Sequence, residues 1–188
     1  MNRRRTGAVW TGLLVIGFAV PAVSADQADD APPRAKADRW QQWRPLVGVW
    51  QGTSEGEPGK GSVRLDVSFV LSERFLKIAG TADYKKGAGG EHHEDFGYVS
   101  EDSGRKTKVF RQFHAEGFVN QYILTSDPDR GELIELTSET CENAPPGWKA
   151  RERYAVKGDT LEHTFELAPP DKPFALYTRA KLSRVRKD

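Results

Sequence analysis

The chain has 188 residues, of which 29% are charged and 37% are hydrophobic, and its formal net charge is +1. Basic and acidic residues are mixed along the chain, which argues against nucleic acid or an anionic membrane surface as the partner. Cys141 is the single cysteine, so no disulfide can form within the chain and no pair of thiolates can hold a metal. We interpret Cys141 as a structural or incidental thiol and expect the fold to depend on a hydrophobic core.

Residues 1–25 have the features of a secretory signal peptide. Arginines at positions 3–5 precede an apolar run at 8–20, and small residues at 23–25 form a cleavage site. The apolar run is too short to span a bilayer, although an uncleaved anchor is the alternative. We expect cleavage after Ala25 and a periplasmic or secreted protein that does not span the membrane. Cleavage would leave one domain with 25 basic and 27 acidic residues, a net charge of −2.

The next segment is expected to be irregular and then briefly helical. Residues 26–37 are rich in Ala, Asp and Pro and have no periodicity, so they are predicted to be a disordered linker. Asp38 is in position to cap a short helix that runs through Trp43 and ends at Pro45. Trp40 and Trp43 lie about one helical turn apart on an apolar face. We expect these indoles to plug one end of the fold.

From Gly48 onward, apolar and polar residues alternate with period two, which is typical of half-buried strands. Turn residues separate the alternating segments, and no long helix intervenes. The expected strands are 49–54, 63–71, 74–83, 92–100, 107–114, 118–126, 132–141, 149–156, 160–167 and 174–185. We predict an all-β fold for residues 38–188, a closed antiparallel up-and-down barrel of about ten strands, since closure removes bare edges. Such a barrel has room for side chains or one small ligand.

Several polar residues fall in the apolar register and are therefore expected to point inward. Buried ionisable groups must be paired or hydrogen-bonded, because leaving them alone costs several kcal/mol or shifts their pKa. The set forms either a self-satisfied network or the polar end of a ligand pocket, and we leave both open. The predicted ligand-binding residues are Arg111, Asn120, Tyr122, Glu152, Tyr154 and His163.

The sequence does not favour a metal site or an active site. His92 and His93 are adjacent on a predicted strand and must point to opposite faces, so we expect a solvated strand entry and no metal. His114 falls in the other register and is expected at a strand end. Glu152 and His163 have the chemistry of an acid and a base, but no catalytic motif accompanies them. We therefore expect binding rather than catalysis.

The segments 46–52, 55–57 and 174–185 carry a resemblance to known barrels. With Gly48-Val49-Trp50 on the first strand, the chain resembles the calycin superfamily, and more closely the nitrobindin-like, heme-binding-type barrels and an uncharacterised bacterial family beside them. The resemblance implies a lipocalin-like barrel without a helical lid. It also implies that an arginine of the last strand covers the tryptophan, and Arg179 is the expected partner of Trp50 in closing the barrel.

The resemblance leaves the ligand open. The heme-binding relatives hold iron through a histidine on the last strand, but no histidine follows His163 here. A tyrosine can ligate heme iron, which makes Tyr177 the remaining candidate. We predict an exported barrel that binds a small hydrophobic or amphipathic molecule, with no cofactor. The alternatives are a nitrobindin-like heme protein whose axial ligand is not evident, and a ligand-free envelope interaction module.

Overall fold

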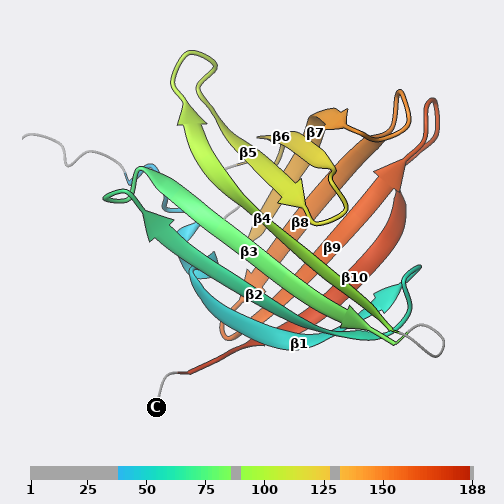
Figure 1. Ribbon diagram of the computed structural model, residues 1–188. Coiled ribbons are helices and arrows are strands. Elements are labelled where there is room, and N and C mark those ends of the chain that lie inside the picture. Colours follow the sequence, from blue (N-terminus) through green and yellow to red (C-terminus); the bar gives the residue numbers. More distant parts are fainter. Residues whose placement is uncertain (1–37, 86–89, 128–131, 187–188) are drawn as a thin grey trace, which may run out of the picture. The chain divides into compact units, whose positions relative to one another are not determined.

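The computed structural model describes residues 38–85, 90–127 and 132–186. Ten strands form one closed antiparallel barrel in which each strand pairs with its neighbours in the chain and β1 pairs with β10 (Figure 1). The strands are β1 (Gly48–Gly56), β2 (Gly61–Val70), β3 (Phe75–Tyr84), β4 (Glu91–Asp102), β5 (Thr107–His114), β6 (Val119–Leu124), β7 (Leu133–Glu142), β8 (Lys149–Lys157), β9 (Thr160–Ala168) and β10 (Ala175–Arg184). The predicted closed barrel of ten strands is confirmed. The predicted signal peptide and linker lie outside the described residues.

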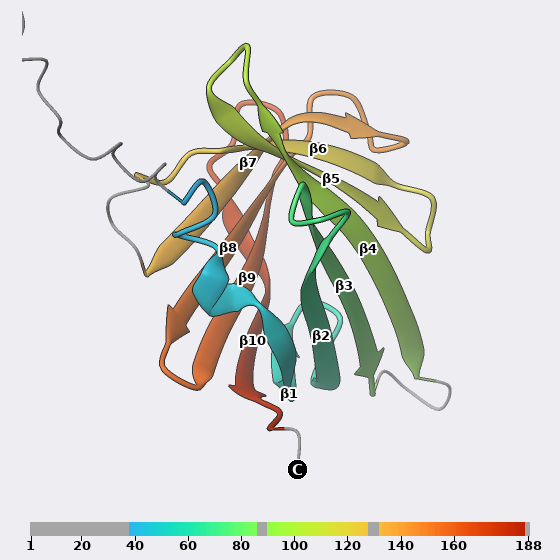
Figure 2. The same cartoon turned by 90° about the vertical axis from the view of Figure 1, so that its left-hand side faces the viewer.

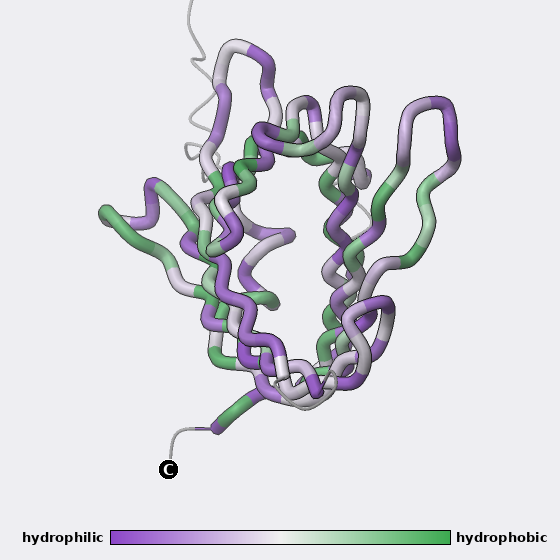
Figure 3. The backbone as a smooth tube through the Cα atoms, turned by 45° about the vertical axis from the view of Figure 1, so that its right-hand side comes forward, coloured by the Kyte–Doolittle hydropathy of each residue, from purple (hydrophilic) through white to green (hydrophobic). Residues whose placement is uncertain are grey.

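The strands form where the sequence alternates, because one face of each strand is buried in the barrel. In β3, for example, Leu76 and Ile78 are fully buried, while the intervening Lys77 is only partly buried. Figure 3 looks into the barrel and shows the backbone closing around its interior. Within the described ranges, no helix is long and apolar enough to cross a membrane.

The predicted helix ending at Pro45 is not observed. Asp38 does accept a hydrogen bond from the backbone N–H of Trp40 at 3.0 Å, as a capping residue would. The chain then makes successive turns and one short 3-10 helix, η1 (Arg44–Leu46), with Pro45 inside it rather than after it. Proline is tolerated at the start of a helix because the N–H it lacks has no partner there.

The segment before β1 closes one end of the barrel, as expected for the tryptophan plug. Trp40 and Trp43 are each 1% exposed. The Trp40 indole N–H donates to the carbonyl of Glu73, in the β2–β3 turn, at 2.8 Å, and Gln42 donates to the carbonyl of Leu133, at the start of β7, at 3.0 Å. The ammonium group of Lys108, on β5, lies 5.0 Å from the Trp40 ring centre. These contacts cross the closed end of the barrel. Figure 2 shows the segment beside β7 and β8.

A close approach at the seam between β1 and β10 requires a glycine. A Cβ atom on Gly52 would lie 2.0 Å from the backbone oxygen of Lys181 and 2.9 Å from the Cα of Leu182. Neither backbone atom can move without separating the two strands that close the barrel.

We therefore expect Gly52→Ala to lower the free energy of unfolding by about 1–3 kcal/mol, in the range of other overpacked sites. Gly104→Ala is the matched control, since its Cβ would meet nothing closer than 3.4 Å. The control should change stability by less than about 0.5 kcal/mol. Urea denaturation measures both, and equal effects would show that the seam is not tightly packed.

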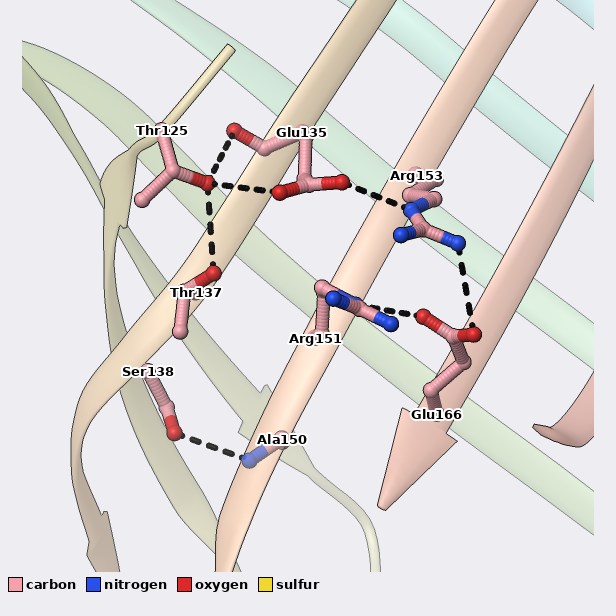
Figure 4. A network of polar contacts seen from close by, with 8 residues as sticks. All are labelled: Thr125, Glu135, Thr137, Ser138, Ala150, Arg151, Arg153 and Glu166. Atoms are coloured by element: carbon pink, nitrogen blue, oxygen red, sulfur yellow. Dashed lines mark hydrogen bonds and ion pairs between the residues drawn. The ribbon is translucent and has the colours of Figure 1, made fainter. Parts of the chain in front are cut away.

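The outer face of β7, β8 and β9 carries a network of charged side chains (Figure 4). Arg153 donates to Glu135 at 2.7 Å and to Glu166 at 3.3 Å, and Arg151 donates to Glu166 at 2.5 Å. Because Arg151 and Arg153 are paired on the outer face, period-two geometry turns Glu152, which lies between them, and Tyr154 inward. This alternation positions the polar groups of the interior.

Candidate functional site

A cavity of about 380 Å³ lies inside the barrel, at the end opposite the tryptophan plug. Its lining includes Pro58, Glu116 and Pro145, which belong to the β1–β2, β5–β6 and β7–β8 connections. In an up-and-down barrel these connections lie at the end opposite the β2–β3 turn, which the plug contacts. Apolar walls are formed by Val63, Leu65, Ala82, Phe118, Trp148 and Phe165.

Five of the six predicted ligand-binding residues face the interior. Asn120, Glu152 and Tyr154 are buried or nearly so and line the cavity, as does the partly exposed His163. Tyr122 is fully buried beneath the cavity wall, where it supports Asn120 rather than lining the space. The period-two pattern of β6, β8 and β9 predicted that these five side chains point inward, and the structure confirms that orientation.

Arg111 is the exception, and its predicted inward orientation is wrong. Its side chain is exposed and donates to the hydroxyl of Ser100 at 3.2 Å on the outside of the barrel. Phe113, an apolar residue in the same register as Arg111, is 41% exposed and stacks on Phe96. The inward residues of β5 are those of the other register, including Gln112. Apolar residues occur on both faces of β5, so alternation alone chose the wrong one.

Glu152 and His163 form an ion pair inside the barrel. The His163 Nε2 contacts a Glu152 carboxylate oxygen, and the Glu152 side chain is 3% exposed. The His163 ring stacks on Tyr154 with ring centres 4.6 Å apart and an interplanar angle of 9°. Burial lowers the pKa of His163, but the adjacent Glu152 carboxylate outweighs burial, so the pKa is raised above its ordinary value. The pair presents a charged group on the cavity wall.

A second polar cluster, formed by His93, Asp95, Gln112, His114 and Glu116, was not predicted. His93 lies between two carboxylates, with Nδ1 2.7 Å from Glu116 and Nε2 3.4 Å from Asp95. The Asp95 carboxylate, helped by Glu116 and opposed by burial, raises the pKa of His93 to about 9. Burial lowers the pKa of His114. The cluster thus combines charged and neutral imidazoles.

Hydrogen bonds link this cluster to the predicted residues. Gln112 donates to Asp95 at 2.9 Å and accepts from the Tyr122 hydroxyl at 3.1 Å. The Asn120 amide nitrogen lies 3.0 Å from the Tyr122 hydroxyl and 3.1 Å from the His114 Nε2. One network therefore runs across β4, β5 and β6 and holds both histidines in place.

The cluster was missed because the β4 entry looked like a solvated surface. The prediction that His92 and His93 face opposite sides is confirmed: His92 is exposed and pairs with Asp83 at 2.7 Å. His93, however, turns into the cavity together with Asp95. Opposite Asp95 on β3 is Gly80, whose missing side chain leaves room for the carboxylate, since a Cβ there would lie 2.9 Å from it. His93 and Asp95 lie an even number of residues from the buried Val99 on the same strand, and this period of two could have predicted that both side chains point inward.

The predicted pair of Trp50 and Arg179 is also corrected. Trp50 is fully buried, but the guanidinium over its ring, 4.0 Å from the centre, belongs to Arg184. Arg179 is exposed and lies 3.8 Å from Glu162. Strand register is the reason, because Trp50 faces Arg184 across β1 and β10, whereas Arg179 faces Glu55. An arginine of the last strand does cover the indole, as expected, but it lies five residues further along the chain than Arg179.

Two further residues singled out in the sequence lie on the cavity wall. Cys141 is a free, partly buried thiol that packs against the core and lines the cavity. Tyr177 lines the cavity too, with its ring edge-on to Phe165 at 5.8 Å. Burial and the nearby Glu91 raise the pKa of the Tyr177 hydroxyl.

A solved structure shares this fold. A crystal structure of Rv2717c from M. tuberculosis matches with a TM-score of 0.57 at 20% sequence identity, covering 78% of this chain and 97% of that chain. A protein with unknown function from the DUF3598 family of Nostoc punctiforme matches with a TM-score of 0.26 at 9% identity, covering 79% and 99%. No family model and no curated protein matches the sequence. The likeness to the first structure, at 20% identity, shows a shared fold.

Proposed function

We propose that the protein is an exported, lipocalin-like barrel that binds a small amphipathic molecule in its interior without catalysing a reaction. The observation that carries this proposal is the cavity of about 380 Å³, which combines apolar walls with a few convergent polar groups. Small-molecule sites typically have volumes of about 300–1,000 Å³ and this mixture of lining residues. Export follows from the leader-like residues 1–25, and an intact mass matching cleavage after Ala25 would support it.

The two polar clusters give the proposed ligand an orientation. The Glu152 and His163 pair lies on β8 and β9, and the network around Asn120 lies on β4 to β6. Aromatic and aliphatic walls, including Phe118 and Trp148 near the cavity mouth, would hold the apolar part. A molecule with one polar head and a compact apolar body fits this distribution.

The test of ligand binding uses protein purified from its host, because that protein can retain its natural ligand. Native mass spectrometry should show a retained ligand, which refolding from guanidinium removes. Nile red, a neutral lipophilic dye, should then bind the refolded protein and change the fluorescence of Trp148. The other described tryptophans are buried in the core away from the cavity lining, so Trp148→Phe should abolish that change. Protein at apo mass that also takes up no dye would contradict the proposal.

Filling the cavity should abolish binding. Ala82, on β3, is 5% exposed and lines the cavity, so Ala82→Trp places an indole in the space the ligand needs. We expect Nile red affinity to fall by at least about tenfold, equivalent to 1.4 kcal/mol. Arg111→Ala is the control, because Arg111 lies on the outside, and it should leave both affinity and stability unchanged. Unchanged affinity in a folded Ala82→Trp variant would place the dye elsewhere.

Heme binding is the second candidate, and the last strand, β10, lacks the histidine ligand that the resemblance implies. Tyr177 lines the cavity, yet its raised pKa opposes the phenolate that would coordinate iron. We expect hemin to produce no specific Soret shift. A shift that Tyr177→Phe removes would instead favour heme.

The third candidate, a ligand-free interaction module, requires a filled interior. The cavity disfavours it, because native interiors are close-packed and contain few voids larger than a water molecule. Failure of every ligand test above would leave this candidate as the better one.

A further inference from the structure

Three side chains that suit a metal ion meet at the mouth of the cavity. His93 comes from β4, His114 is the last residue of β5, and Glu116 lies in the turn that follows. One ligand atom from each residue lies within 4.8 Å of those of the other two. All three residues line the cavity.

The local backbone explains why they converge. His114 pairs with Asp95 across β4 and β5, which places it one inward position from His93. The turn then folds back on itself: the Gly117 N–H donates to the His114 carbonyl at 2.8 Å, with Gly117 at φ +90°. Only glycine adopts that conformation without strain. The reversal carries the Glu116 carboxylate over His93.

We propose that His93, His114 and Glu116 form a binding site for a divalent transition-metal ion of the zinc class. Two imidazoles and one carboxylate are a donor set that zinc uses when one coordination position stays open. Ligand atoms of tetrahedral zinc lie about 3.4 Å apart, given bond lengths of about 2.0–2.1 Å, so small side-chain rotations would close the site. The open position would face the cavity.

The surroundings of His93 match those of a metal-bound histidine. A ligating imidazole commonly donates its other N–H to a carboxylate, which fixes its tautomer and orientation. Here Asp95 lies on the Nε2 side of His93, at 3.4 Å, while Nδ1 points toward Glu116. Asp95 is itself held by Gln112 at 2.9 Å. One of the proposed ligands, His93, therefore already has an outer carboxylate beside it.

The charge of the cavity also favours a cation. Four of the described side chains that line it are carboxylates, Glu91, Asp95, Glu116 and Glu152, against one lysine, Lys149, and two imidazoles with a raised pKa, those of His93 and His163. A dication between Glu116 and the two imidazoles would offset part of this negative charge at short range. This proposal does not depend on the amphipathic ligand, because the metal alone is the probe.

Isothermal titration of the untagged protein with Zn²⁺ tests the site. We expect one zinc per chain, and visible absorption bands when Co²⁺ replaces it. His93→Ala and His114→Ala should each weaken zinc binding by more than about tenfold, and Asp95→Asn by about 10–100-fold. His92→Ala is the matched control, since the adjacent exposed histidine points away from the cavity and should bind zinc as the wild type does.

A measurement on the unmodified chain covers the case of a variant that does not fold. The protein has four histidines, so each imidazole can be followed by NMR. Zinc should shift the signals of His93 and His114 and leave those of His92 and His163 in place. No zinc binding by the wild type, or binding that shifts other histidines instead, would overturn the proposal and leave the cluster as an ion-pair network.

Discussion

Trp50→Ala is expected to lower the free energy of unfolding by about 3–5 kcal/mol, the usual cost of removing a large buried aromatic side chain. Trp50 is fully buried, and its indole N–H donates to the Leu46 carbonyl at 2.8 Å. The alanine variant would leave a cavity between the first strand and the segment that closes the barrel end. Urea denaturation followed by circular dichroism measures the loss. A loss below about 1 kcal/mol would mean that the indole is not part of a close-packed core.

The arginine that covers Trp50 provides the controls. Arg184 lies over the indole and also donates to the carbonyls of Val47, at 2.5 Å, and Pro45, at 2.7 Å. Arg184→Ala should therefore cost about 2 kcal/mol, through lost cation–π contact and charged hydrogen bonds. Arg179→Ala removes an exposed side chain and should change stability by less than about 0.5 kcal/mol. The opposite order would restore Arg179 as the closing residue.

His163→Leu is expected to destabilise the barrel by about 3 kcal/mol, because it leaves the buried Glu152 carboxylate without its partner. Replacing both members, as Glu152→Met with His163→Leu, should recover most of this loss, since an apolar pair of similar volume needs no charge compensation. Denaturation of refolded, ligand-free protein measures the single and double variants. Additive losses in the double variant would show that the two side chains do not interact.

The same pair predicts a pH dependence with a definite sign. The pKa of His163 is raised in the folded protein, where Glu152 outweighs burial. Its contribution to stability is therefore complete below the unfolded histidine pKa of about 6.5, and is lost as the pH rises through the higher folded value. The wild type should lose stability over that range relative to the Glu152→Met, His163→Leu double variant. Parallel pH profiles for the two proteins would contradict this.

Much of the architecture could be predicted because burial on one face of a strand imposes a period of two. The β5 strand was predicted at its observed bounds, and closure followed from the need to remove bare edges. The inward positions of Asn120, Glu152 and His163 came from the same pattern. Alternation failed for Arg111, because Phe113 beside it packs on the outer surface against Phe96.

The sequence by itself determined that this chain folds as a closed barrel with polar groups inside, since local alternation and turn residues encode which face of each strand is apolar. Tertiary structure alone decided which side chains meet. Register between β1 and β10 placed Arg184 rather than Arg179 over Trp50. Pairing of β4 with β5, and the turn after His114, gathered the cluster around His93. Such contacts depend on the alignment of neighbouring strands, a property that periodicity within one strand does not contain.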